Sequence, residues 1–347
     1  MVDKDKKKVR IIMKVAQLTK YNKKNPQILI SDASLPPLGP YDLLIQVKAA
    51  GVNPLDNLIA RGDLKLVVPY KLPQTLGNEF VGLIQQTGKN VTNFKVGDRV
   101  YGRNPLNNIG AFAEELVVNQ SAVAHVPEYL TNQEAASIPL TALTAIQALE
   151  LLQAKPGQTL FISGGTGSFG AMAIPIAVAK GLKVITSGSP QNQQRVEQLG
   201  VNKFIDYTKE DYTKVLSGID LVIDTLGGKE TIKQMAILRP YGKLVSLRGM
   251  PNKEFAKRMK MSKFKQGLFS LASRSIEKEA AKKKIDYQFL FVTANGQQLA
   301  AANKILVENQ IHPTVGKIFS LNKVSQAMEK VQQGHNKGKV IIDMSKN

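Results

Sequence analysis

The stretch LFISGGTGSFG at residues 160–170 decides the fold of the second half of the chain. A short apolar run leads into Gly165, Gly167 and Gly170, which have the spacing G-x-G-x-x-G, and a helical pattern follows. In this arrangement the first glycine permits a tight turn, the second lets a pyrophosphate approach the backbone, and the third brings helix and strand together. Amides at the helix N-terminus then bind the anion. The alternative is a glycine-rich turn that holds no ligand.

Strand and helix patterns alternate from residue 131 onward. The run TNQE at 131–134 has the form of a capping box and predicts a helix start, and Pro175 predicts a kink in the helix after the glycines. Such alternation is typical of a doubly wound parallel sheet with helices on both faces, here in a domain of residues 131–309. Short strands are expected at 159–163, 183–186, 203–205, 221–224, 243–247 and 287–292.

Residues 1–130 have a different pattern, in which short strands are separated by glycine, proline and asparagine turns. Strands are expected at 42–51 and 78–88, and this punctuation is typical of a β-rich, barrel-like domain. The end of the chain returns to short strands at 317–320 and 339–343. We therefore expect residues 310–347 to complete the first domain.

The composition excludes several classes of site. The chain has 347 residues, 43% of them hydrophobic, which is enough for two domains with buried cores. It contains no cysteine, so disulfides, thiol catalysis and cysteine-ligated metal sites are absent. Its three histidines are far apart in sequence and form no metal motif. No long apolar run or signal sequence is present, so a soluble cytoplasmic protein is expected.

The residues after the second strand of the α/β domain predict which dinucleotide is bound. An NAD site usually has an acidic residue at the end of this strand for the ribose 2′-hydroxyl. Here no acid occurs before Glu197, small residues such as Ser187 take its place, and Arg195 lies nearby. A charge-assisted hydrogen bond from an arginine to a 2′-phosphate is worth about 1.5–3 kcal/mol. The sequence therefore predicts NADP, and a solvated Arg195 is the alternative.

Further motifs accompany the glycine motif, namely AGVNPLD at 50–56, GNEFVG at 77–82, VGDRVYG at 96–102, GAFAEE at 110–115, PLTALTA at 139–145 and GKVII at 338–342. Together these residues resemble the medium-chain dehydrogenase/reductase superfamily, in particular its zinc-free quinone oxidoreductase-like branch. The resemblance covers essentially the whole chain and implies a GroES-like β-barrel catalytic domain, a Rossmann domain, and an active-site cleft between them. The zinc members have cysteine and histidine where this chain has Asn53 and Asn78. The implied reaction is hydride transfer to a quinone or an α,β-unsaturated carbonyl without zinc.

The resemblance also implies site residues and an assembly. It places Asn53 beside the nicotinamide and makes Asp56 and Thr144 candidate catalytic residues, although a turn-capping role is the alternative for Asp56. It implies a homodimer. The expected cofactor-binding residues are Ser163, Gly164, Gly165, Thr166, Gly167, Ser187, Gly188, Arg195, Tyr207, Gly228, Ser246, Leu247, Arg248, Gly249 and Lys339.

A basic segment at 251–285 interrupts the strand–helix alternation. Its lysines, arginines and apolar residues predict one or two basic amphipathic helices. They are expected to cover the cleft, or to contact a membrane surface or RNA. The net charge of +20 also makes the whole chain a candidate for binding RNA or an anionic membrane surface. The alternative function is therefore a nucleotide-regulated protein of this fold that binds RNA or a membrane surface, although the glycine motif favours the enzyme.

Overall fold

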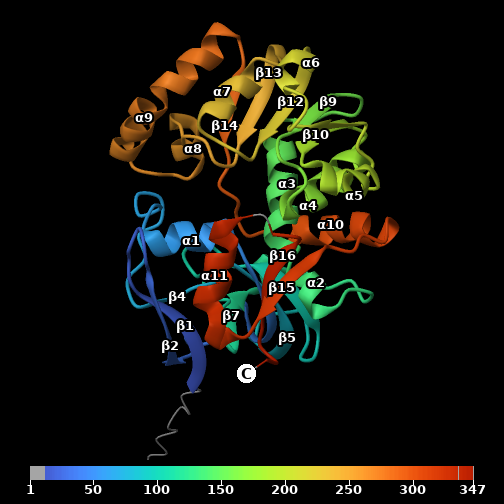
Figure 1. Cartoon of the computed structure of the whole chain (residues 1–347). Coiled ribbons are helices and arrows are strands. Elements are labelled where there is room, and N and C mark those ends of the chain that lie inside the picture. Colours follow the sequence, from blue (N-terminus) through green and yellow to red (C-terminus); the bar gives the residue numbers. More distant parts are fainter. Residues whose placement is uncertain (1–11, 335, 347) are drawn as a thin grey trace, which may run out of the picture. The chain divides into compact units, whose positions relative to one another are not determined.

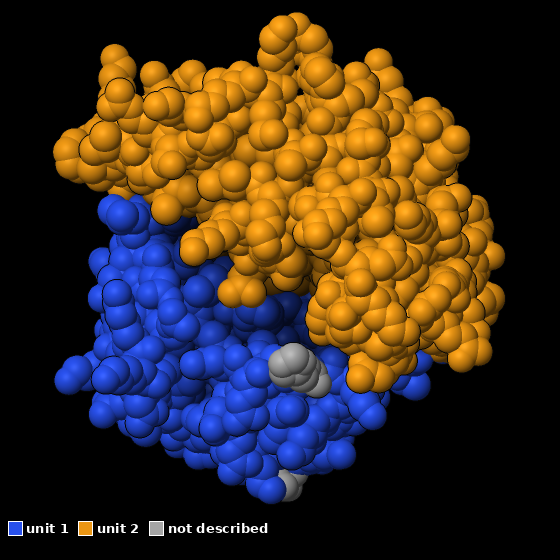
Figure 2. Space-filling view, turned by 45° about the horizontal axis from the view of Figure 1, so that its top comes forward, with its two compact units in different colours: residues 1–139, 294–297, 315–347 blue, residues 140–293, 298–314 orange. Residues whose placement is uncertain are grey.

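The computed structural model describes residues 12–334 and 336–346. The chain forms two compact units, which Figure 2 distinguishes by colour. Unit 1 comprises residues 1–139, 294–297 and 315–347, and unit 2 comprises residues 140–293 and 298–314. The division falls after residue 139, not after residue 130, because the short helix α2 (Asn132–Ala135) packs against strands β3 (Asp42–Val52) and β5 (Glu79–Thr87) of unit 1.

Unit 1 contains a mainly antiparallel sheet with the strand order β15-β16-β3-β5-β6-β8 and with β7 paired to β3 (Figure 1). A smaller sheet has the order β2-β1-β4. The apolar run of β3 explains its central place, since it is buried while it pairs with β5, β7 and β16. Further bounds are β1 Ile12–Lys20, β2 Gln27–Ser34, β4 Gln74–Thr75, β6 Arg99–Arg103, β7 Glu115–Asn119, β8 Val123–His125, β15 Val315–Phe319, β16 Lys339–Asp343, α1 Pro54–Arg61 and α11 Val324–Gln333.

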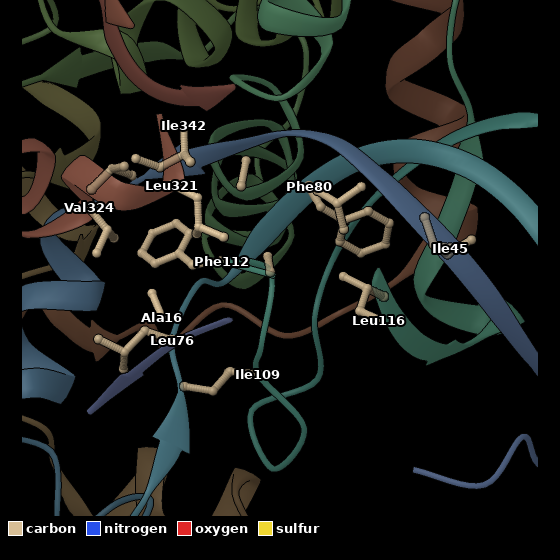
Figure 3. Packing of buried hydrophobic residues seen from close by; sticks show 14 of the residues in the cluster. Ala16, Ile45, Leu76, Phe80, Ile109, Phe112, Leu116, Leu321, Val324 and Ile342 are labelled. Carbon is tan, nitrogen blue, oxygen red and sulfur yellow. The ribbon is translucent and has the colours of Figure 1, made fainter. Parts of the chain in front are cut away.

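One hydrophobic core joins the two ends of the chain within unit 1. Phe80 and Phe112 are fully buried in it, and Figure 3 shows them among side chains of the first part of the chain. The C-terminal segment contributes Leu321, Val324 and Ile342 to the same cluster. Burying such side chains stabilises a fold by about 1.5–3 kcal/mol each, so the returning segment is held by its core residues as well as by strand pairing.

Unit 2 contains a six-stranded parallel sheet with the order β11-β10-β9-β12-β13-β14. This is the strand order of a doubly wound dinucleotide-binding domain, and the order reverses between β9 and β12, beside the glycine loop. The predicted GroES-like plus Rossmann architecture is confirmed. The bounds are β9 Thr159–Ile162, β10 Lys183–Gly188, β11 Lys203–Asp206, β12 Ile219–Asp224, β13 Leu238–Ser246, β14 Asp286–Phe289, α3 Pro139–Leu151, α4 Ser168–Ala179, α5 Gln193–Glu197, α6 Tyr212–Val215, α7 Lys229–Met235, α8 Lys253–Arg258, α9 Lys263–Lys282 and α10 Gly296–Glu308.

Local signals in the sequence correspond to local features of the structure. The capping box forms as predicted, with Thr131 and Glu134 each bonded to the other's backbone amide. The helix that it starts, α2, ends after one turn at Ala135, and α3 begins at Pro139. Helix α4 runs through Pro175 without a break, and the basic segment forms the two helices α8 and α9. Among the described residues no helix is long and apolar enough to cross a bilayer.

Candidate functional site

The glycine loop between β9 and α4 is built by one left-handed residue and two close approaches. Gly164, the residue before the motif, has a φ of +62° and is the left-handed residue of the turn. A Cβ at Gly165 would lie 2.2 Å from the hydroxyl of Thr186 on the neighbouring strand. A Cβ at Gly170 would lie 1.9 Å from the Gly165 carbonyl oxygen, so the predicted close approach of helix to strand is present.

Space for an anion lies at Gly167, the residue that precedes α4. A Cβ at Gly167 would have only the Gly164 carbonyl oxygen near it, at 4.0 Å. Gly167 supplies no side-chain cap to the 12-residue helix. The first amides of a helix carry partial positive charge and lack intrahelical acceptors. The loop therefore fits the diphosphate of a dinucleotide.

Hydroxyl groups hold the backbone of this loop. Thr186 donates to the Ile162 carbonyl at 2.7 Å and accepts from the Gly165 amide at 3.1 Å. The predicted site residue Ser163 accepts from the Thr225 amide at 2.9 Å, and its carbonyl accepts from the Thr225 hydroxyl at 2.6 Å. Ser163 and Thr186 are fully buried, so they position the loop instead of facing solvent. Sequence reasoning did not identify Thr186 or Thr225.

Arg195 on α5 reaches the glycine loop. Its Nη2 donates to the Thr166 carbonyl and its Nη1 to the Thr314 hydroxyl, the latter at 3.3 Å. Partial burial lowers the pKa of the guanidinium from its usual value. Gly188 is also beside Thr166, because a Cβ at Gly188 would lie 2.0 Å from the Thr166 methyl group. Arg195 is thus bonded to the glycine loop and is not a solvated helix residue. Tyr207, in contrast, is 59% exposed.

A buried carboxylate organises the loops after β12 and β13. Asp224, the last residue of β12, is fully buried and was not identified from the sequence. Its oxygens accept hydrogen bonds from two backbone amides and three side chains at 2.6–3.0 Å. An acid at the carboxyl end of a buried parallel strand is the signal that could have identified it. The donors are the amides of Leu226 and Gly227 and the side chains of Thr231, Gln234 and Ser246.

The predicted residues after β13 belong to this network. Ser246 donates to Asp224 at 2.6 Å and accepts from the Gly249 amide at 2.7 Å. Leu247 donates its amide to the Asp224 carbonyl, and the Arg248 carbonyl lies 2.5 Å from where a Cβ on Gly227 would be. Gly228 precedes α7 with a φ of +60°. The structure therefore brings these two loops together.

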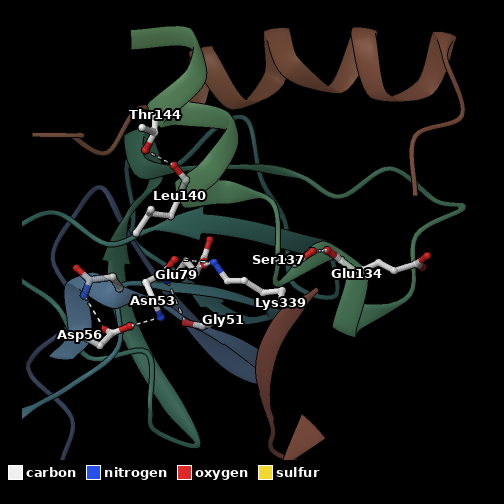
Figure 4. A network of polar contacts seen from close by, with 10 residues as sticks. Gly51, Asn53, Asp56, Glu79, Glu134, Ser137, Leu140, Thr144 and Lys339 are labelled. Carbon is white, nitrogen blue, oxygen red and sulfur yellow. Dashed lines mark hydrogen bonds and ion pairs between the residues drawn. The ribbon is translucent and has the colours of Figure 1, made fainter. Parts of the chain in front are cut away.

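Unit 1 contains a second polar group, centred on Asn53 (Figure 4). Its amide nitrogen donates to Glu79 at 2.8 Å, and its amide oxygen accepts from Lys339 at 2.6 Å. Lys339 also forms an ion pair with Glu79 at 2.5 Å. All three residues are at most 3% exposed. The ammonium group of Lys339, an expected cofactor-binding residue, thus binds two side chains of its own unit.

Asp56 extends this group at the start of α1. One carboxylate oxygen accepts from the backbone amide of Asn53 at 2.8 Å, and the other accepts from the side chain of Asn78 at 2.7 Å. The bond to the Asn53 backbone caps the helix. It is fully buried, and that burial raises the pKa of its carboxyl to about 6. We call Asn53, Asp56, Asn78, Glu79 and Lys339 the unit 1 polar cluster. Glu79 was not identified from the sequence, although an acidic residue that opens an apolar strand is a usable signal.

The third candidate catalytic residue, Thr144, lies on α3 in unit 2. Its hydroxyl donates to the Leu140 carbonyl at 2.7 Å, one turn earlier in the same helix. The hydroxyl proton is therefore used within the helix. Among residues 12–334 and 336–346, no three histidine, aspartate or glutamate side chains are grouped so as to hold a metal ion.

Comparisons with known proteins agree with this architecture. The alcohol dehydrogenase GroES-like domain matches residues 39–128, and the zinc-binding dehydrogenase family matches residues 199–342. The chain is 28% identical to the mitochondrial NAD(P)H oxidoreductase RTN4IP1 of Danio rerio, over 96% of this chain and 92% of the relative. It is also 28% identical to a 2-methylene-furan-3-one reductase of Solanum lycopersicum, over 95% and 79% of the two chains.

A solved structure with similar fold and sequence is the quinone oxidoreductase from Coxiella burnetii. The TM-score is 0.81 at 27% identity, and the match covers 96% of this chain and all of the other. The two family matches, the relatives and this fold agree with a GroES-like unit followed by a Rossmann unit. The chain belongs to the medium-chain dehydrogenase/reductase superfamily of nicotinamide-nucleotide-dependent oxidoreductases, among its quinone oxidoreductase-like members.

Proposed function

We propose that this protein transfers a hydride from NADPH to a quinone or an α,β-unsaturated carbonyl without zinc. The observation that carries the proposal is the glycine loop of unit 2, which is open at Gly167 and bonded to Arg195. No acidic residue occurs from 183 to 196, the stretch in which an NAD-specific site places one. A 2′-phosphate beside this stretch would therefore meet the Arg195 cation and no acidic residue from 183–196.

The residues of unit 2 bind and orient the nucleotide in this proposal. When bound, the nucleotide supplies the hydride from C4 of its nicotinamide ring. The amides at the start of α4 hold the diphosphate, and Arg195 pairs with the 2′-phosphate near Thr166. The Asp224 network fixes the loops after β12 and β13, which gives the ribose and nicotinamide a rigid boundary.

The choice of acceptor follows from the polar groups of unit 1. Asn53 and Asn78 stand where the zinc members have cysteine and histidine, and neutral amides are poor zinc ligands. A quinone or conjugated carbonyl delocalises the incoming negative charge over its own atoms. Its reduction therefore needs less stabilisation from a Lewis acid. The reduction of either takes up one hydride and one proton. Asn53 is the proposed polar group beside the nicotinamide. Lys339 and Glu79 hold its side chain in place, and the buried Asp56 holds its backbone amide. The names of the tomato and Coxiella relatives support these two acceptor classes.

A nucleotide titration tests the cofactor part of the proposal. The parent protein should bind NADPH more tightly than NADH by about ten- to a hundredfold, the value of one charge-assisted hydrogen bond. Arg195→Ala should lose this preference while the affinity for NADH stays the same. Arg239→Ala is the matched control, because that arginine pairs with Asp220 on the surface of the same unit. Equal affinities in the parent, or an equal loss for both nucleotides in Arg195→Ala, would overturn the NADP assignment.

A panel of acceptors tests the reaction. NADPH oxidation should proceed with a naphthoquinone or an α,β-unsaturated ketone, and should be unaffected by a zinc chelator. A simple aldehyde should be a poor acceptor, since it cannot delocalise the charge. Turnover on the aldehyde alone would contradict the acceptor class. No turnover on any of the three, with salt-sensitive retention of RNA, would favour the nucleotide-regulated binding protein.

A further inference from the structure

Helix α9 has two opposite faces, and only one of them is covered. Phe269, Ile276 and Ala280 are buried, and the helix packs against α7, α8 and β14 (Figure 1). Phe269 meets the ring of Phe255 on α8 edge-on, with 6.0 Å between the ring centroids. This side of α9 therefore belongs to the fold of unit 2.

The other face carries large apolar side chains in solvent. Phe264 is 75% exposed, Leu271 is 69% exposed and Leu268 is 39% exposed. At 100° per residue, positions separated by four and seven residues lie on one side of a helix. These three residues, which we call the α9 apolar stripe, point away from the buried face. Exposed apolar groups at helical spacing mark a surface for interaction.

Cations lie along both sides of the α9 apolar stripe. Lys263, Arg274 and Lys278 are exposed and fall on one side by helical spacing, and Lys265 falls on the other. From 251 to 285 the chain has eleven basic and three acidic residues. Of the acids on α9, Glu279 is paired with Lys282 at 2.7 Å. The whole segment therefore presents an excess of positive charge around three apolar side chains.

This combination favours one kind of occupant. A second copy of the chain would bring two basic faces together, which costs energy. A protein partner is disfavoured because lysine is depleted at protein interfaces. Single-stranded RNA needs several stacking rings, and Phe264 is the one exposed aromatic residue that α9 has. An anionic bilayer matches both the α9 apolar stripe and the flanking cations, since it accepts apolar side chains at the acyl boundary and lysines at its phosphates.

We propose that α9 docks the protein on anionic phospholipid surfaces, with the α9 apolar stripe in the bilayer interface and the flanking cations among the headgroups. The helix lies in the plane of the surface and does not cross it. Each lysine near such a surface contributes about fivefold to binding, and the contribution is screened by salt. The proposal does not depend on which nucleotide or acceptor the protein uses.

Co-sedimentation of the full chain with vesicles tests the docking. We expect binding to vesicles of phosphatidylcholine with about one third phosphatidylglycerol, little binding to pure phosphatidylcholine, and release when salt is raised from about 0.1 M to about 1 M. Equal binding to both vesicles, or to neither, would overturn the proposal. So would salt-sensitive RNA retention with no vesicle binding.

Matched variants then locate the contact. Phe264→Ser/Leu271→Ser and Lys263→Gln/Lys278→Gln should each weaken binding to the anionic vesicles by about tenfold or more. Lys23→Gln/Lys24→Gln in unit 1 removes the same charge from another exposed site and should leave binding within about twofold. If that control loses as much as the α9 charge variant, attraction is general and α9 is not the docking helix.

A tryptophan reporter gives a second readout, because the chain contains none. Leu271→Trp should show a blue-shifted emission maximum when anionic vesicles are added. Val307→Trp on α10, where the parent side chain is 45% exposed, should show no shift. An unchanged spectrum for Leu271→Trp in the presence of sedimenting vesicles would place the contact elsewhere and overturn the proposal.

Discussion

The ammonium group of Lys339 lies 2.5 Å from a carboxylate oxygen of Glu79, and neither residue is more than 3% exposed. Lys339 opens the last strand, β16, and Glu79 opens β5, and these two strands flank β3 in the sheet of unit 1. Asn53, the residue just after β3, forms hydrogen bonds with both Glu79 and Lys339. The end of the chain is thus tied by a buried charge to the residues that precede α1.

Loss of this lysine should destabilise unit 1. Lys339→Met leaves the Glu79 carboxylate buried without its cation, which costs about 3–5 kcal/mol. Adding Glu79→Gln should recover part of the loss. Urea unfolding measures each variant. Lys14→Met is the control, because its pair with Asp32 is 56% exposed on both sides and is worth at most about 1 kcal/mol. Similar losses for the buried and the exposed lysine would contradict the assignment.

Asp56 should make stability depend on pH. Burial raises the pKa of this carboxyl from 3.8 to about 6 in the folded protein, so between these values the folded state binds more protons than the unfolded state. Its contribution to the free energy of unfolding therefore rises as pH falls from about 6 to about 4, by about 3 kcal/mol, and is lost again as pH rises.

Asp56→Asn removes that titration. Urea unfolding of parent and variant from pH 4 to pH 7 should give a difference in free energy of unfolding that changes across this window by up to about 3 kcal/mol. The comparison with the variant cancels the other carboxylates, several of which have lowered pKa values. Parallel curves would show that Asp56 titrates normally.

The glycine loop should not tolerate a methyl group at Gly170. Gly170→Ala places a Cβ 1.9 Å from the Gly165 carbonyl oxygen, so helix and loop must separate at a cost of about 1–3 kcal/mol. Thermal unfolding and NADPH titration should both show the loss. Gly267→Ala is the matched control, since its Cβ meets nothing within 4 Å and a helix-interior alanine adds about 1 kcal/mol of stability. A Gly170→Ala protein as stable as Gly267→Ala would refute the close approach.

The hydroxyl of Ser246 should matter for nucleotide binding. Ser246→Ala leaves the Gly249 amide without its acceptor and removes one of the two side-chain donors to Asp224 Oδ2, which costs about 1–3 kcal/mol and loosens the loop after β13. We expect the KM for nucleotide to rise more than kcat falls. Thr213→Ala is the control, because its hydroxyl bonds Asp211 at an exposed helix start. If kinetics are unchanged in Ser246→Ala, the Asp224 network does not support the nucleotide site.

Several features of the protein were predictable from residues close together in sequence. The spacing of Gly165, Gly167 and Gly170 predicts the turn between strand and helix, and TNQE at 131–134 predicts its capping box. Both features can be predicted locally, because a turn or a helix cap is formed by residues that are neighbours in the sequence. Strand and helix periods likewise predict the parallel sheet of unit 2.

Other features depend on contacts between distant segments. The sequence by itself determined the two fold classes, the glycine loop and the lack of thiol chemistry, because each follows from residue type and short-range spacing. Only the tertiary structure decided that Lys339 meets Glu79, that Asp224 gathers the loops after β12 and β13, and that Arg195 reaches Thr166. Strand register and sheet order bring such partners together, and no local pattern specifies which buried donor will meet which acceptor.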